Sequence, residues 1–311
     1  MAFTNSSGYQ NLAQGNFTPQ IFSQKVQKFF RRASVVEDIT NTDYAGEIEN
    51  FGDTVKIIKE PTITVKDYAR GQTVDTQVLA DDQITMTVDQ GSYFAFKVDD
   101  IEERQSHVNF EALATSSGAY SLKRNYDYNV LKFIYDNATN GTSTGTDASP
   151  IDGDAAVDTL ANLVSTAKKN LDRNDVPEEN RWLVSSPEFF EQLRKAGAKL
   201  SDQSVMADGG SSQIRNGMVT DRPLFGFNMY STNAIAVSGG AATSQTFGSS
   251  GSNEFAFLYG HMSGVATVNH IAKTELIRDP DSFADVVRGL HVYGRKILRS
   301  EAVRSGVITI G

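Results

Sequence analysis

The chain has 311 residues, of which 39% are hydrophobic and 22% are charged, and it contains no cysteine. This length allows a large core and about two domains, and the composition is typical of a soluble globular protein. The lack of cysteine excludes disulfide bonds, thiolate nucleophiles and cysteine-ligated zinc. No apolar run approaches the roughly eighteen residues that cross a bilayer, and the first residues lack the apolar stretch of a secretory signal. We therefore expect no membrane contact and a protein made in a cytoplasm.

The net charge of −9 is distributed unevenly. Residues 1–36 contain four basic side chains and no acidic one, a charge of +4 that leaves −13 for the rest. These four are Lys25, Lys28, Arg31 and Arg32. They lie opposite the apolar face of a helix predicted to begin at Thr18 and Pro19. Two interpretations stay open: the helix packs on its own domain, or it lies on a neighbouring subunit with its basic side towards an anionic surface. The acidic body repels nucleic acid, whereas this arm can contact it.

Residues 107–136 predict the longest helix of the chain, because apolar residues return at intervals of three or four along them. About thirty residues at 1.5 Å each give a rod of roughly 45 Å. Its apolar stripe is only one or two side chains wide. Such a rod needs a sheet lying along it.

Three short segments of residues 51–98 alternate between apolar and polar side chains, as strands with one apolar face do. Their apolar members are Val55 and Ile57, then Ile63 and Val65, then Ile84, Met86 and Val88. They predict a long two-stranded ribbon from about Asp53 to Val88, with a polar centre around Gly71. An isolated ribbon is marginally stable and its edges invite pairing. Two supports remain possible: another copy of the chain, or the protein's own core.

The next strand alternates around Phe94, Phe96 and Val98, with Tyr93 on its other face, and is expected to enter the core beside the long helix. Four acidic residues follow it: Asp99, Asp100, Glu102 and Glu103. The EF-hand spacing is absent. We interpret these residues as the acidic start of the helix rather than as a metal site.

The middle third predicts a small α/β unit, and the last third predicts strands. Helical spacing runs from Val157 to Leu171, a strand covers 182–184, a second helix follows Ser186 and Pro187, and a further strand covers 226–230. A flexible loop is expected at 238–253. Strands are then expected at 254–260, 265–278, 283–298 and 305–311, and a turn at 279–281 makes the second and third hairpin partners. These strands supply the sheet that the long helix needs.

Catalytic signatures are absent from the sequence. It contains no phosphate-binding or dinucleotide-binding glycine motif, no nucleophile elbow and no zinc-protease motif. The four histidines are spread singly, at positions 107, 261, 270 and 291. We interpret His270 and His291 as hydrogen-bonded histidines of a sheet. The sequence predicts no catalytic residue, no cofactor and no metal site.

Three stretches, residues 88–106, 180–193 and 255–303, together resemble the major capsid proteins of tailed double-stranded DNA bacteriophages with the HK97 fold. Their order and separation match that family from about residue 20 to the C-terminus. The resemblance implies an α+β protein with four parts: an N-terminal arm (1–45), an extended β-hairpin called the E-loop (46–92), a peripheral domain with a long spine helix and a β-sheet (93–150 and 263–298), and an axial α/β domain (151–262 and 299–311).

The resemblance also implies a structural function. Subunits of that family form hexamers and pentamers, which build the icosahedral head around viral double-stranded DNA, and each E-loop lies over a neighbour. We therefore expect a virion protein that is not an enzyme and is assembled in the host cytoplasm, with itself, a portal protein and a decoration protein as partners. Lys25, Lys28, Arg31 and Arg32 would contact the packaged DNA without reading its sequence.

Two departures from the family concern assembly and cross-linking. Some relatives carry a cleaved scaffolding segment; here the arm begins almost at once, which implies a separate scaffolding protein. Some relatives cross-link a lysine to an asparagine, and neither Lys66 nor Lys97 can be matched to that position. The alternatives are an encapsulin-like nanocompartment shell and a soluble enzyme with a site assembled from distant residues.

Overall fold

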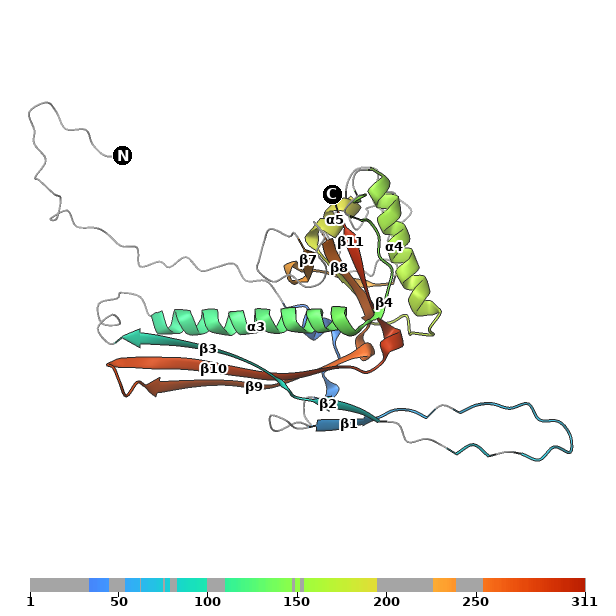
Figure 1. Ribbon diagram of the computed structural model, residues 1–311, viewed down its shortest axis with the longest axis horizontal. Helices are drawn as coiled ribbons and strands as arrows, with labels where there is room; N and C mark the ends of the chain where they lie inside the picture. Colours follow the sequence, from blue (N-terminus) through green and yellow to red (C-terminus); the bar gives the residue numbers. More distant parts are fainter. Residues whose placement is uncertain are drawn as a thin grey trace, which may run out of the picture.

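The computed structural model describes residues 34–44, 54–99, 110–194, 226–238 and 254–310, except 62, 75, 79–82, 147, 148, 152 and 153. The predicted arm helix with its four basic residues, most of the acidic segment after residue 99, and most of the loop predicted at 238–253 lie outside these residues. The described part is an elongated body of two larger sheets joined by one long helix, with a two-stranded sheet from which a loop projects (Figure 1).

The long helix is α3 (Phe110–Asn137), 28 residues that confirm the predicted spine helix. One part of α3 lies along a three-stranded sheet, and its C-terminal part reaches the second sheet (Figure 1). There Val130, Leu131 and Ile134 are fully buried. The helix therefore belongs to both halves of the body.

The three-stranded sheet is antiparallel, in the order β3-β10-β9. Its strands are β3 (Gln90–Asp99), β9 (Val265–Arg278) and β10 (Ala284–Ile297). The predicted hairpin of the last two is confirmed, and its turn is closed by the bond from the Asp279 amide to the Ala284 carbonyl, at 3.0 Å. Phe94 lies opposite Gly289 and faces α3, whereas Tyr93, opposite Leu290, faces the other way, since cross-strand partners share a face.

The second sheet has six strands, in the order β4-β11-β8-β5-β6, with β7 paired to β8. The strands are β4 (Thr139–Asn140), β5 (Arg181–Ser185), β6 (Asn228–Ser231), β7 (Ala236–Ser238), β8 (Glu254–His261) and β11 (Val303–Thr309). Two helices, α4 (Asp154–Asp172) and α5 (Pro187–Arg194), cover one face; α3 and the short α1 (Val36–Ile39) cover the other. Short turns of 3-10 helix, η4 (Asn233–Ile235), η5 (Met262–Gly264) and η6 (Ser300–Ala302), lie between the strands.

Strand β8 shows why this sheet sits between two layers. Phe255 and Phe257 pack into the core under α4 and α5, whereas Ala256 and Leu258 pack into the core under α3. Successive side chains of a strand point to opposite faces. Because both faces are covered, the strand is apolar at nearly every position.

The predicted ribbon is confirmed only at its base. Strands β1 (Thr54–Ile58) and β2 (Gln83–Thr87) pair over five residues each, and no strand occurs among the described residues from 59 to 78. At the base, Val55 and Met86 are buried against β9 and β10. Farther out, the alternating apolar side chains are exposed, with no layer covering them among the described residues, and a ladder of two strands alone is marginal. The expectation of a continuous ribbon to Val88 was therefore wrong.

Candidate assembly surfaces

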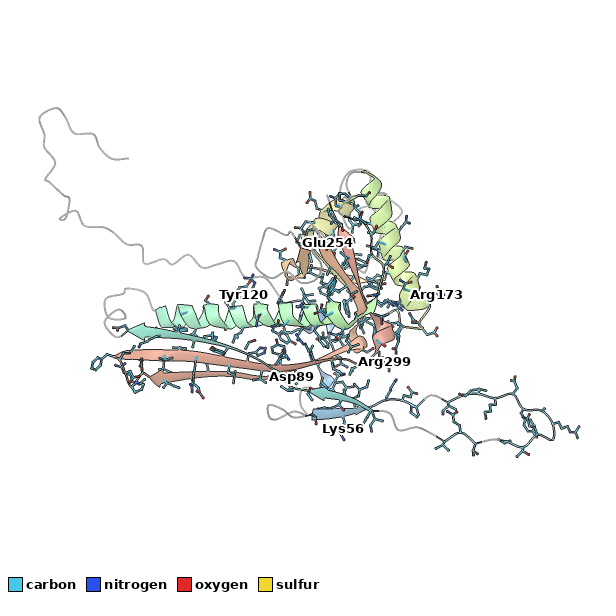
Figure 2. All side chains as sticks on the ribbon, viewed as in Figure 1. Lys56, Asp89, Tyr120, Arg173, Glu254 and Arg299 are labelled. Atoms are coloured by element: carbon cyan, nitrogen blue, oxygen red, sulfur yellow. The ribbon has the colours of Figure 1, made fainter. Side chains whose placement is uncertain are left out.

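The segment from the end of β1 to residue 78, here called the projecting loop, exposes large apolar side chains. It holds six of the eleven such side chains exposed in the described part of the chain: Ile58, Ile63, Val65, Tyr68, Val74 and Val78. Val65 is 92% exposed and Val78 is 90% exposed. In Figure 2 this loop extends away from the body, and its side chains point in several directions. Burying one such side chain is worth about 1.5–3 kcal/mol, so the loop offers a partner on the order of 10 kcal/mol before the cost of association.

The position of the loop is set at its base and tip. At the base, a Cβ on Gly294 of β10 would lie 2.8 Å from the Thr87 carbonyl oxygen, so the absence of a side chain lets the hairpin sit directly on β10. At the tip, the Gln72 amide donates to the Ala69 carbonyl at 3.0 Å, and Gly71 adopts a φ of +90°. A positive φ of this kind is the conformation that glycine accommodates. The two sides of the loop therefore run back towards the same hairpin.

The face of the three-stranded sheet that points away from α3, here called the outer face, carries rows of cross-strand partners. One row joins Tyr93, which is 78% exposed, to Leu290, which is 42% exposed. The next row contains Arg288 opposite Glu275, whose charged groups lie 2.7 Å apart. The outer face thus offers an aromatic and aliphatic patch beside a fixed ion pair. Such a surface can bind both apolar and charged side chains.

The turn after β9 is held by charge. Lys97 of β3 donates to Asp279 at 2.5 Å, and the Ser282 hydroxyl donates to the same carboxylate at 2.8 Å. These bonds, the one from Lys97 first, lower the pKa of Asp279 to about 2. Phe283 follows in this turn and is 81% exposed. The sheet therefore ends in an ordered tip that presents a large aromatic side chain.

The last part of the predicted arm, residues 34–41, is tied to α3 and β9. The Ser34 hydroxyl donates to Asp127 at 2.6 Å, and Lys123 pairs with Glu37 at 3.1 Å. Beyond α1, the Asn41 amide donates to the Val265 carbonyl at 2.8 Å. The end of the arm is therefore fixed on α3.

Sequence comparison identifies the family. The model of the phage capsid protein family matches residues 59–305. The chain belongs to the phage capsid protein family. No curated protein matches the chain with significant similarity.

Solved structures agree with this membership. One from Mycobacterium phage Che8 has a TM-score of 0.78 and 28% identity, and the match covers 94% of this capsid protein and 98% of that chain. The capsid structure of cyanophage P-SCSP1u has a TM-score of 0.71 and 16% identity, over 96% of this chain and 94% of that one. The mature capsid of bacteriophage PhiM1 has a TM-score of 0.69 and 16% identity, and the match covers 94% of this chain and 92% of that one.

These findings confirm the α+β, HK97-like capsid fold and a structural, non-enzymatic shell protein of the phage particle, which self-assembles. They favour this function over the nanocompartment shell and the soluble enzyme. Within the described residues, no helix is both long and apolar enough to span a membrane. In the same residues, no group of three side chains of the kinds that ligate metals was found.

The histidines of the capsid protein differ from the prediction at one position. His291 is not hydrogen-bonded through Nδ1, which is buried and has no partner among the described residues. Instead its ring stacks on Tyr293 and meets Tyr126 edge-on, with ring centres 5.3 and 5.4 Å away. Burial lowers its pKa. Aromatic packing, which sequence alternation does not reveal, holds this ring.

His261 accepts a bond from the Ser263 amide at 3.1 Å and caps η5. His107 and the side chain of His270 lie outside the described residues.

The predicted DNA-contacting residues, Lys25, Lys28, Arg31 and Arg32, lie outside the described part of the structure. Tyr93 and Phe94 were predicted to point to opposite faces of the sheet, and the structure confirms this. The exposure of Phe283 was not predicted. A large aromatic residue inside a polar turn was the signal that could have indicated it.

Proposed function

We propose that this capsid protein forms hexamers and pentamers that build an icosahedral head around viral double-stranded DNA, and that its projecting loop lies on the outer face of a neighbouring subunit. The observation that carries the proposal is the set of six exposed apolar side chains on the loop. Interfaces of obligate assemblies bury about 2,000–5,000 Å² and are rich in apolar area. A second copy supplies such cover in a shell.

The chemistry of the two surfaces supports this pairing. The loop places apolar side chains such as Val65 and Tyr68 beside charged ones such as Lys66 and Arg70. The outer face places the apolar row of Tyr93 beside the ion pair of Arg288. Apolar contacts at the centre with charged groups around them are typical of specific interfaces.

The four-part layout inferred from the sequence remains our proposal for the domains. The arm covers 1–45, the E-loop 46–92, the peripheral domain 93–150 and 263–298, and the axial domain 151–262 and 299–311. The pairing of β11 with β8 supports grouping the last residues with the axial domain. The packing of α3 along the β3-β10-β9 sheet supports the peripheral domain.

The basic arm is proposed to contact the packaged DNA through Lys25, Lys28, Arg31 and Arg32, by charge and without sequence preference. Its +4 charge beside an acidic body supports this role. A separate scaffolding protein, a portal protein and a decoration protein are the further partners that we propose. Assembly takes place in the host cytoplasm under this proposal.

The decisive experiment introduces charge into the loop. In the full chain, Val65→Asp combined with Val78→Asp should abolish shells in electron micrographs and leave subunits or small oligomers in sedimentation. Both positions are about nine-tenths exposed, so the fold should survive. Fluorescence of Trp182, the single tryptophan, which is buried, checks this. The matched control, Val65→Ile with Val78→Ile, should form normal shells. Normal shells from the aspartate variant would overturn the role of the loop.

A second variant tests the receiving surface. Tyr93→Asp places a charge on the outer face without touching the loop, and it should also prevent shells. If the loop variant fails to assemble while Tyr93→Asp assembles normally, the loop binds a different surface of its neighbour.

A further inference from the structure

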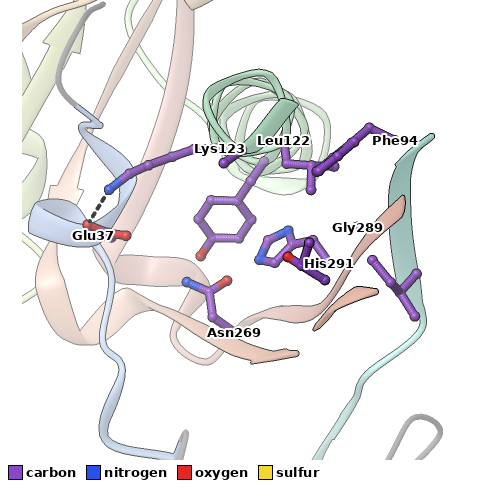
Figure 3. A pocket seen from close by; sticks show the side chains of 11 residues that line it. Glu37, Phe94, Leu122, Lys123, Asn269, Gly289 and His291 are labelled. Carbon is purple, nitrogen blue, oxygen red and sulfur yellow. Dashed lines mark hydrogen bonds and ion pairs between the residues drawn. The ribbon is translucent and has the colours of Figure 1, made fainter. Parts of the chain in front are cut away.

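A cavity of about 210 Å³ lies beside α3, where that helix meets the three-stranded sheet. Its lining is mainly apolar and includes Phe94 of β3 and Ala119 and Leu122 of α3. Figure 3 shows Lys123 joined to Glu37 at one side of the cavity and Phe94 at the other. Ala119 is small and exposed, so the cavity is open to the surface of the body. It can therefore receive an apolar side chain from outside.

The face of β9 that points towards α3 is uncovered beside this cavity. Thr274 lies opposite Gly289, so it shares the face of Phe94. Leu276, two residues farther along the strand, points to the same face. Thr274 is nevertheless exposed, and Leu276 is 60% exposed. The described residues thus leave a strip of β9 open, here called the open strip, which runs from Asn269 at the cavity to Leu276.

The chain that precedes the described residues joins the body close to this cavity. The Ser34 hydroxyl donates to Asp127 at 2.6 Å, and Glu37 pairs with Lys123 at 3.1 Å. Lys123 lies one helical turn before Asp127 on α3, and both Lys123 and Glu37 line the cavity. Residues 1–33 lie outside the described part of the structure. Their attachment point is therefore about one helical turn from the cavity.

The predicted arm helix carries an apolar stripe that leads to this attachment point. Phe22, Val26 and Phe30 recur every four residues, and the next member of the series is Ser34. Residues four apart lie on one face of a helix. The face that continues from Ser34 is therefore apolar, and its nearest member is Phe30. On α3, Lys123 stands in the same relation to Asp127, which brings Phe30 level with the mouth of the cavity.

We propose that the arm helix, residues 19–33, docks on the open strip of its own chain and places the ring of Phe30 in the cavity. An apolar cavity of about 150 Å³ holds benzene, so 210 Å³ accommodates a phenyl ring. The helix spans about 22 Å at 1.5 Å per residue, and the open strip spans about 24 Å at 3.4 Å per residue. The two therefore match in length. The attachment at Ser34 favours the chain's own arm over that of another copy.

This docking corresponds to the first interpretation of the arm helix, in which it packs on its own domain. Its basic side chains lie outside the apolar stripe: Lys25, Lys28, Arg31 and Arg32. They remain available to an anionic partner. The proposal concerns the apolar stripe alone, so it does not depend on the contact with DNA or on the pairing of loop and outer face. Failure of either leaves it intact.

The first test uses introduced cysteines, because the chain has none of its own. In the full chain, Phe30→Cys with Ala119→Cys should form a disulfide within one chain under mild oxidation, since both positions adjoin the cavity. Lys28→Cys with Ala119→Cys is the matched control and should react about tenfold more slowly, because a disulfide requires two closely placed Cβ atoms. A non-reducing gel separates a cross-linked monomer from a dimer. Equal rates for the two pairs, or dimers as the main product, would overturn the proposal.

The second test removes the ring. Trypsin cleaves after the four basic residues of the arm, and a docked helix must open before it is cut. Phe30→Ala should therefore raise the rate of cleavage in the arm of unassembled subunits by about tenfold. Phe17→Ala removes the same ring just before the predicted helix and should leave the rate unchanged. Thermal unfolding verifies that the body of both variants is folded. Equal rates for the two variants would contradict the role of Phe30.

Discussion

Gly289→Ala should destabilise the three-stranded sheet by about 1–3 kcal/mol, the usual cost of overpacking a core. A Cβ at this position would lie 2.4 Å from one edge of the Phe94 ring. Favourable carbon contacts lie at about 3.5–4.0 Å, so the ring must retreat by about 1 Å. The opposite edge of the ring already packs on Gly118 of α3, where an added Cβ would lie only 2.9 Å away. The ring is thus confined between helix and sheet.

The assay is urea unfolding followed by Trp182 fluorescence, at one protein concentration below that of assembly, because association adds stability. Gly91→Ala in the neighbouring strand is the control, since a Cβ there meets nothing within 4 Å. Its stability should change little or rise slightly. In a Phe94→Ala background the cost of Gly289→Ala should fall by about 1 kcal/mol or more. Equal stabilities of Gly289→Ala and Gly91→Ala would refute the reasoning.

Three further predictions concern charged groups. Arg181→Ala should lower the free energy of unfolding by about 2–4 kcal/mol. The reason is that this buried side chain donates to Asp172 at 2.6 Å and to two backbone carbonyls. An unchanged urea midpoint would contradict this prediction. Lys97→Gln should raise the pKa of Asp279 from about 2 towards its ordinary 3.8 in an NMR titration, whereas Arg288→Gln should not. Since the folded-state pKa is depressed, the contribution of Asp279 is present above about pH 4 and is lost as the pH falls through 2. Replacing the four basic residues of the arm by glutamine should reduce the DNA content of purified heads while shells still form, and unchanged packaging measured by absorbance would exclude the DNA contact.

The parts of the fold with regular periodicity could be predicted from the sequence. Returns of apolar residues every three or four positions predicted α3, and alternation together with the turn at Asp279 predicted the hairpin of β9 and β10. These patterns depend only on local geometry. The same alternation at Ile63 and Val65 misled, because strand pairing also needs a layer to pack against, and no described part of the chain covers these two side chains.

The surfaces and the packing under α3 were harder to predict, because they depend on contacts between distant segments. Gly289 accommodates the Phe94 ring only because β3 and β10 pair beneath α3, and the glycine carries no local signal. The environment of His291 likewise follows from rings of Tyr126 and Tyr293 that come from two elements. Exposure of Val65 was only one of two outcomes that the sequence left open, since the support of the predicted ribbon could be another copy of the chain or the protein's own core.

The exposed side chains of the projecting loop also constrain how the sequence can change over generations. In a shell built from one gene product, the loop and the surface that receives it are encoded by the same gene, so a substitution in either alters the same contact in every subunit at once. A small loss of contact energy is multiplied by the number of subunits in the shell. A second substitution that compensates for it must arise in the same gene. Under the proposed contact, Val65 and Val78, which are about nine-tenths exposed in their own chain, are thereby subject to selection as strict as that on a buried residue.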